Sequence, residues 1–496
     1  MTRERPRFSS RFALLASMLG IAVGTGNIWR FPRVAAQSGG STGAGAFLIA
    51  WAICLMSWSI PLIVAEYAMG RAARQGVVGS FAHIAGPKWA PMGAFVSLVA
   101  IGIMFYYSVV AGWCLYYLGH TVCVPLPRDA AAAAAVWSHM HASGAPVACH
   151  LLAFGLCGWA VHRGVASIER VNKVLIPVLL VIVGGSVARA LTLPGAVPGL
   201  SFLFAPHWAS LANPETWLEA LTQNAWDTGA GWGLILGYAA YMRQKDAVVK
   251  NAVITAVGNN VVSLLAAIMV FSTVFAILGP SLEKADILQV MQDSGPASTG
   301  LTFVWMPQLF AQMTGGRIVA VLFFVGLSCA AMTSLISMVE LGTRVLIDAG
   351  MRRRRALLLV VSVGFVLGVP SAVNVTFLSN QDFVWGVGLI ISGAFVAVAV
   401  VRHGVARLRR EVLDQVGGDW RLGTGWQVTL AVLVPLQALV LIGWWIYRSA
   451  TSYAPDSWYD PFDPYSVATC LLQWGVGLGL CFVAGRRLIA TPGRKG

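Results

Sequence analysis

Charged residues are scarce in this chain. Only 11% of its 496 residues are Asp, Glu, Lys or Arg, while 57% are hydrophobic. Soluble globular domains carry roughly 25% charged residues. A soluble fold of this length cannot hide so much apolar surface, and the mean hydropathy of +0.73 agrees. The composition therefore predicts that lipid surrounds most of the chain.

Cysteine pairs and catalytic motifs are also missing. The eight cysteines are scattered without a CxxC pair, so the sequence gives only weak support for a metal or redox centre. Cys123 and Cys149 flank one expected loop and leave both a disulfide and two free thiols open. No HExxH, paired catalytic carboxylates or Ser/His/Asp set lies in the apolar runs, which argues against a membrane-embedded enzyme.

Positive charge is in excess, at a formal +14. A basic chain can bind nucleic acid, but these charges stand in short clusters between apolar runs, which is typical of the positive-inside rule. The basic start followed by an apolar run resembles a signal peptide. Because Gly24, Gly26, Asn27 and Arg30 interrupt that run, we interpret it as a retained first helix.

A helix that crosses the hydrocarbon core needs about 20 apolar residues. We expect twelve such spans, at 11–37, 43–70, 89–120, 147–163, 171–190, 214–242, 246–279, 314–348, 356–374, 382–401, 427–447 and 466–485. The basic clusters fall in alternate loops, so we expect both termini on the cytoplasmic side of a plasma or bacterial inner membrane.

Two spans are interrupted by glycine runs that each carry a polar side chain. Residues 20–27 read GIAVGTGN and residues 226–233 read WDTGAGWG. Unwound backbone survives in a membrane only where it lines a cavity or lies buried in protein. Paired interrupted helices in matching halves of a chain indicate a transporter's central site. We expect an all-α fold of two inverted five-helix repeats.

The expected organisation has four parts. They are a cytoplasmic segment 1–10; a core 11–401, with helices 1–5 at about 11–190 and helices 6–10 at about 214–401; a loop 402–426; and helices 11–12 with a tail, 427–496. The arginine-rich loop is compatible with contact to anionic lipid.

The sequence GIAVGTGNIWRFP at residues 20–32 resembles the first-helix signature of the neurotransmitter:sodium symporter family. Pro61 and the run EYAMGR at 66–71 match the same family, and the similarity extends over about residues 8–400. It is closest to the bacterial amino-acid transporters of the leucine-transporter type. The resemblance implies a sodium-coupled symporter that imports a small neutral amino acid by alternating access.

The resemblance also implies a substrate site. Its residues would be Ala22, Gly24, Thr25, Gly26, Ile103, Tyr107, Trp226, Gly229, Trp232, Cys329 and Thr333. The amine transporters of the family carry aspartate where this chain has Gly24, so we expect a substrate that brings its own carboxylate. Two tryptophans are also compatible with a methylated ammonium, as in a betaine.

Two sodium sites follow from the same resemblance. The first would use Ala22, Asn27, Asp227 and Asn259. The second would use Gly20, Val23, Val325, Ser328 and Cys329. A thiol at Cys329 is a soft ligand for a hard cation.

Asp227 departs from the family, which usually has a hydroxyl residue there. Ser263 stands where chloride-independent members supply a carboxylate. Because an aspartate inside a membrane is costly and normally functional, we expect Asp227 to supply the negative charge, so that chloride is not required. A buried aspartate satisfied by Asn259, without an ionic role, is the alternative.

The resemblance further implies an outer gate of Arg30 and Asp382 and an inner gate with Arg5 and Tyr241. The usual inner-gate aspartate is Thr343 here, and Glu340 is a possible substitute. The expected partners are a zwitterionic substrate and the lipid bilayer, not nucleic acid. A betaine carrier and a binding-only sensor on the same fold remain as alternatives, and the oligomeric state stays open.

Overall fold

The computed structural model describes residues 6–292, 299–485 and 488. In the first half of the chain the helices are α1 (Arg11–Ala22), α2 (Gly26–Gly39), α3 (Gly45–Cys54), α4 (Ile60–Ala73), α5 (Val77–Ala85), α6 (Ala90–Cys123), α7 (Ala130–Ala142), α8 (Ala145–Val161), α9 (Val165–Leu191) and α10 (Ala196–Phe204). A π-helical turn at Leu55–Ser59 joins α3 and α4 into one span.

The second half begins with another interrupted pair. Its helices are α11 (Pro214–Asp227), α12 (Leu234–Ala239), α13 (Val249–Leu278), α14 (Lys284–Gln292), α15 (Met306–Ala311), α16 (Gly316–Asp348), α17 (Arg353–Val373), α18 (Val375–His403), α19 (Val405–Leu408), α20 (Thr424–Val428), α21 (Val434–Arg448) and α22 (Val467–Gly485). The expected all-α fold is confirmed.

Nine helices of the described chain are long and apolar enough to cross a membrane, and two bent pairs raise that number to eleven. One bent pair is α1 with α2, which meet at 47° and form the first span. In the other, α7 and α8 meet at 74°, and α8 alone corresponds to the fourth expected span. The pair α11 and α12 is the interrupted sixth span, which completes the twelve.

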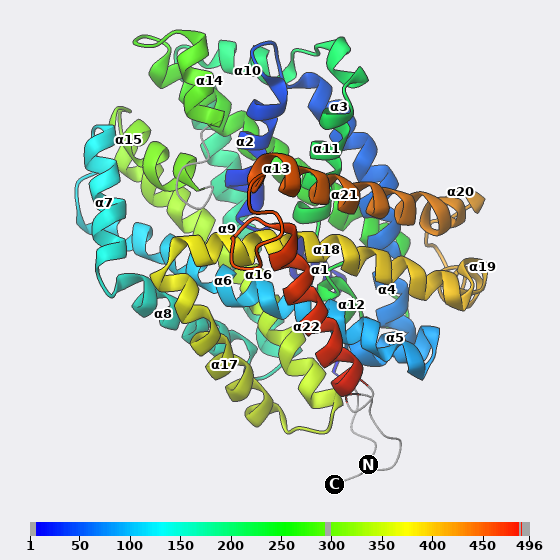
Figure 1. Cartoon of the computed structure of the whole chain (residues 1–496). Coiled ribbons are helices and arrows are strands. Elements are labelled where there is room, and N and C mark those ends of the chain that lie inside the picture. Colours follow the sequence, from blue (N-terminus) through cyan, green and yellow to red (C-terminus); the bar gives the residue numbers. More distant parts are fainter. Residues whose placement is uncertain (1–5, 293–298, 486–487, 489–496) are drawn as a thin grey trace.

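Burial separates inner from outer spans. In their most apolar windows α6 is 78% buried and α13, α16 and α18 are each 72% buried, whereas α22 is 33% buried and the α20–α21 span 22%. The outer helices expose large apolar side chains such as Leu439 and Phe482. In lipid such exposure costs nothing, so the core of the molecule lies around α6, α13, α16 and α18, with α21 and α22 at its edge (Figure 1).

The two repeats run in opposite directions. Ser9, just before α1, bonds to Glu169 at the start of α9, and α22 ends against Pro91 at the start of α6. We call this side the termini face. Since α1 begins the first repeat on this face and five spans separate it from α11, the second repeat begins on the opposite side. There lie α10 and α14, at the top of Figure 1. We call that side the vestibule face.

One expected loop is in fact largely helical. Residues 121–146 contain α7, which begins with six alanines, and Asp129 caps it by accepting a hydrogen bond from the Ala132 N–H at 2.8 Å. Alanine is the strongest helix former, so local propensity accounts for this helix. All eight cysteines, Cys123 and Cys149 included, are free thiols.

Candidate functional site

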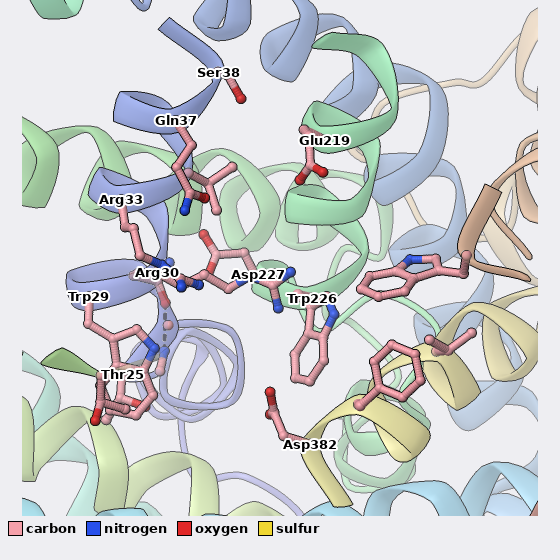
Figure 2. A pocket seen from close by; sticks show the side chains of 18 of the residues that line it. Thr25, Trp29, Arg30, Arg33, Gln37, Ser38, Glu219, Trp226, Asp227 and Asp382 are labelled. Atoms are coloured by element: carbon pink, nitrogen blue, oxygen red, sulfur yellow. Dashed lines mark hydrogen bonds between the residues drawn. The ribbon is translucent and has the colours of Figure 1, made fainter. Parts of the chain in front are cut away.

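A cavity of about 1080 Å³ runs from the two helix breaks toward the vestibule face. Figure 2 shows Thr25, Arg30 and Arg33 entering it from α2, and Glu219 and Trp226 from α11. Asp382 of α18 approaches from another side. The cavity therefore joins the predicted central site to the predicted outer gate.

The first break leaves backbone groups without helical partners. Helix α1 ends at Ala22 and α2 begins at Gly26, with Thr25 at its N-cap. The Thr25 N–H and hydroxyl both donate to the Tyr107 hydroxyl of α6, at 3.3 and 3.2 Å. A helix N-terminus carries partial positive charge and suits a carboxylate. Tyr107 thus lies where it can share an anionic ligand with the amides of α2.

Gly24 leaves little room for a side chain. A Cβ there would lie 3.2 Å from the Ser334 hydroxyl and 3.4 Å from the Tyr107 hydroxyl. Its N–H donates to the Asn27 side-chain oxygen at 2.8 Å. The first break is therefore held by its own asparagine and is crowded by two hydroxyl groups.

Three alternate glycines make the second break. Gly229, Gly231 and Gly233 have φ of 71°, 85° and 75°, a region that other residues rarely adopt. The buried carboxylate of Glu66 in α4 accepts from the Gly231 N–H at 2.5 Å and the Leu236 N–H at 3.1 Å. Sequence reasoning noted Glu66 only as part of a family motif; its role in holding the unwound loop required the structure.

The predicted first sodium ligands lie together. One end of the Asn259 amide is 2.9 Å from the Ala22 carbonyl oxygen and 3.2 Å from the Asp227 carbonyl oxygen. The Asn27 amide nitrogen is 2.8 Å from Asn259 and 2.7 Å from the Ser263 hydroxyl. Ser263 in turn donates to the Asp227 carboxylate at 2.7 Å. The Ala22 and Asp227 carbonyl oxygens and one end of the Asn259 amide converge here, close to the Asp227 carboxylate, and hard cations prefer oxygen ligands. Asn27 turns its nitrogen toward this group, while its oxygen accepts from the Gly24 N–H.

Of the predicted second sodium ligands, Gly20 lies on α1 and Val23 directly follows it, whereas Val325, Ser328 and Cys329 lie on α16, which packs against α1. Gly20 packs against Thr333, since a Cβ on Gly20 would lie 3.1 Å from the Thr333 Cβ. The Ser328 hydroxyl is buried and has no hydrogen-bond partner among the described residues. Ser334, which the sequence analysis did not select, donates to the Gly20 carbonyl at 3.5 Å. An unpartnered buried hydroxyl fits a cation ligand.

Most predicted substrate residues line the cavity. These are Ala22, Gly24, Thr25, Gly26, Ile103, Tyr107, Trp226, Gly229 and Trp232. Cys329 and Thr333 are not part of its wall; Ser334 and Met338 line it instead. The two sets lie on neighbouring stripes of α16. Thr333 faces α1, while the stripe one residue further, at Ser334 and Met338, faces the cavity.

The predicted outer gate is open. Arg30 and Asp382 both line the cavity. No ion pair joins them among those of the described residues. The Arg30 guanidinium instead lies 4.7 Å from the Trp226 ring centroid. The vestibule is therefore accessible down to the helix breaks.

The termini face is closed by hydrogen bonds and ion pairs. The Tyr241 hydroxyl donates to Glu340 at 2.7 Å, and Glu340 also pairs with Arg353 of α17. Thr343 donates to the Val339 carbonyl of its own helix at 2.7 Å. Glu340 thus occupies the place expected for the inner-gate carboxylate. Arg5, the other predicted gate residue, lies outside the described residues.

The described residues hold no group of three or more His, Cys, Asp or Glu side chains able to bind a metal ion. Carbonyl, amide and hydroxyl oxygens around the breaks match an alkali cation better than a transition metal. The arrangement can bind a hard cation beside an anionic group within one cavity.

Comparison with known proteins gives a consistent result. The chain is 29% identical over 452 residues to an uncharacterised sodium-dependent transporter of Methanocaldococcus jannaschii, covering 87% of this chain and 89% of that one. It is 28% identical over 467 residues to the uncharacterised sodium-dependent transporter YhdH of Bacillus subtilis, covering 89% and 98%. The crystal structure of MhsT in complex with L-phenylalanine matches with a TM-score of 0.76 at 28% identity, covering 88% of this chain and 99% of that one.

The family model described as the sodium:neurotransmitter symporter family matches residues 5–143 and 141–490. That match covers nearly the whole chain and includes both interrupted helices, which confirms the resemblance found in the sequence. The chain belongs to the sodium:neurotransmitter symporter family, a family of sodium-dependent membrane transporters.

Proposed function

We propose that the protein imports a small neutral amino acid together with sodium, by alternating access across the plasma or inner membrane. The termini face is cytoplasmic and the vestibule face is external. The observation that carries this proposal is the first break, where the α2 amides and the Tyr107 hydroxyl meet at an open cavity and Gly24 supplies no side-chain carboxylate. A substrate carboxylate binds there, and its ammonium faces carbonyl oxygens of the breaks.

One sodium ion binds between the substrate carboxylate and the oxygens of Ala22, Asn27, Asp227 and Asn259. Asp227 is 6% exposed and its carboxylate accepts from Ser263, so its negative charge lies beside this ion at the inner end of the cavity. In such surroundings a fixed carboxylate stabilises a cation strongly. Asp227 supplies the charge that chloride supplies elsewhere in the family, and transport does not require chloride.

An amino acid fits the site better than a betaine. A quaternary ammonium needs a free aromatic face, and Trp226 is the tryptophan nearest the gate. Its ring already carries Arg30 at 4.7 Å, and its partner Trp232 meets it edge-on at 75°. The guanidinium therefore competes for the face that a methylated ammonium would use.

Thermal stabilisation of the purified protein tests the proposal. A panel of amino acids, betaines and amines is compared in sodium chloride, sodium gluconate and potassium chloride. We expect a neutral amino acid to stabilise the protein in both sodium salts and not in potassium. Stabilisation by a betaine alone, or only in chloride, contradicts the substrate or the Asp227 assignment respectively. Stabilisation without sodium-driven uptake in proteoliposomes indicates a sensor.

Asp227→Asn gives the sharper test of the ionic role. Loss of the charge lowers the apparent sodium affinity by about tenfold or more, equivalent to about 1.4 kcal/mol. Asp227→Ser leaves space for an anion, and we expect chloride to restore part of the lost affinity in that variant only. Unchanged sodium affinity in both variants leaves Asp227 as a satisfied buried residue without an ionic role.

A further inference from the structure

One amide lies on the buried stripe of α9. This stripe includes Ile168, Asn172, Ile176 and Leu179 at helical spacing, so it faces the interior of the bundle. Asn172 is 0% exposed, and neither its nitrogen nor its oxygen has a hydrogen-bond partner among the described residues. A buried polar group left without a partner is costly, and an ion or water that visits it is one established explanation.

Helix register places Asn172 one turn below the second sodium site. A Cβ on Gly20 of α1 would lie 3.3 Å from Ile176 of α9 and 3.1 Å from Thr333 of α16, so these three residues share one level. Helices α1 and α9 both rise from the termini face. One turn nearer that face are Ser17 on α1 and Asn172 on α9.

Helix α16 runs the other way, so the next residue toward the termini face on the same stripe is Ser337, four positions after Thr333. Ser17 is 0% exposed and its hydroxyl also has no partner among the described residues. Ser337 is fully buried and donates to the Thr333 carbonyl at 3.0 Å, and its hydroxyl also faces Tyr238. Helix register therefore puts Ser17, Asn172 and Ser337 at one level, and we call this set of residues the transit layer.

The next turn toward the termini face ends in a carboxylate. Glu169, three residues before Asn172, accepts from the Ser9 N–H at 2.8 Å and pairs with Lys173 at 2.5 Å. Ser9 belongs to the segment before α1, and the Arg243 guanidinium holds its carbonyl at 3.1 Å. A polar series therefore leads from the second sodium site through the transit layer to Glu169, where the segment before α1 closes it.

We propose that the transit layer is a temporary binding site for the sodium ion that leaves the second site toward the cytoplasm, with Glu169 as the next acceptor once Ser9 withdraws. This inference rests on the proposed function and on a second sodium ion bound at the predicted second site. Hydroxyl and amide oxygens suit a hard cation.

Two substitutions at Asn172 test the site in proteoliposomes, because they should shift inhibition by internal sodium in opposite directions. Asn172→Leu removes the amide at similar volume, and sodium-driven uptake should fall about tenfold. Asn172→Asp holds the ion more tightly, so internal sodium should inhibit uptake at a concentration about tenfold lower than in the unchanged protein. In Asn172→Leu the same inhibition should need more internal sodium. The sodium concentration that half-saturates substrate-dependent thermal stabilisation should stay the same, because neither proposed external-facing sodium site is altered.

Ser272→Ala is the matched control for a Ser17→Ala variant. Both hydroxyls are completely buried and have no partner within the described chain, but Ser272 lies on α13, away from this route. Ser17→Ala should weaken inhibition by internal sodium and Ser272→Ala should not. If Asn172→Leu fails to fold, Asn172→Ala and Ser17→Ala give the same comparison.

A purely structural role predicts that uptake falls without any shift in internal-sodium inhibition, and that result overturns the transit site. So does an equal shift in Ser272→Ala. If the unchanged protein shows no sodium-dependent uptake, the proposed function itself fails. The two failures are therefore distinguishable.

Discussion

The two faces of the molecule are built differently. On the vestibule face a cavity of about 1080 Å³ reaches the helix breaks, and Arg30 and Asp382 stand apart in its wall. On the termini face Tyr241, Glu340 and Arg353 are joined, and Ser9 is bound to Glu169. One face is open at its gate, and the other is closed by a few buried polar contacts.

Under the proposed function, this difference corresponds to a conformation that accepts ligand from the vestibule. It also shows what has to change for release. Arg30 and Asp382 would have to form an ion pair, whereas Glu340 would have to release Tyr241 and Arg353. In alternating access the outer contacts form while the inner contacts break. A substitution on either face should therefore interrupt the cycle at a different step.

The largest effect is expected from Glu340→Gln. Glu340 is 2% exposed at its side chain and holds both Tyr241 and Arg353. Removing one partner from a buried ion pair costs about 3–5 kcal/mol, so the closed face should open. Uptake should fall at least about tenfold. Hydrogen–deuterium exchange over α1 and α12 should become faster, and this is the measurement that tests the change in conformation.

Thr343→Val is the matched control. Thr343 stands where the family usually has its gate aspartate, but its hydroxyl is bonded to its own helix. We expect nearly unchanged exchange and uptake in this variant. A larger effect from Thr343→Val than from Glu340→Gln would mean that position 343, and not Glu340, holds the inner gate closed.

The sequence predicted the features that depend on local composition. Glycine runs predicted both helix breaks, because glycine weakens a helix. Within a membrane, unwound backbone is tolerated only where it lines a cavity or is buried in protein. The residues Ala22, Asn27, Asp227 and Asn259, chosen by resemblance, do lie together. Apolar run lengths located the spans to within a few residues in most cases, although the expected span 382–401 begins earlier, at Val375.

Features that depend on packing could not be predicted in the same way. Composition does not set the rotation of α16, so Ser334 and Met338 replaced Cys329 and Thr333 in the cavity wall. The partner of Glu340 lies thirteen residues away, across the turn into α17. Asn172 is one more polar residue in the sequence, and only its burial without partners marks it.

A smaller and more selective effect is expected from Asp382→Asn at the open gate. Because Arg30 and Asp382 are unpaired in this conformation, substrate binding measured by sodium-dependent thermal stabilisation should be nearly unchanged. Uptake should fall about tenfold, because closure over the substrate loses its ion pair. Glu219→Gln is the control: Glu219 lines the same cavity from α11 and should affect uptake little. Equal loss of binding and uptake in Asp382→Asn would mean that Asp382 contacts the substrate directly.

The smallest effect concerns the outer helices, to which the sequence analysis assigned no role. Gln473 of α22 donates to Asn380 at 3.0 Å and accepts from Gln381 at 3.3 Å. Gln381 in turn accepts from the Trp385 indole at 2.9 Å. Asn380 and Gln381 directly precede Asp382, so α22 steadies the gate end of α18.

Gln473→Leu should therefore destabilise the end of α18 that carries Asp382, while Arg30 and Asp382 themselves stay in place. Leaving Asn380 and Gln381 without this partner costs about 1–3 kcal/mol, and uptake should fall roughly two- to threefold. The control is the same change at Gln437 of α21, whose amide donates to Ser57 of the α3–α4 span at 2.9 Å. If Gln437→Leu and Gln473→Leu reduce uptake equally, the outer helices only support the fold. If only Gln473→Leu does so, the open face depends on α22 as the closed face depends on Glu340.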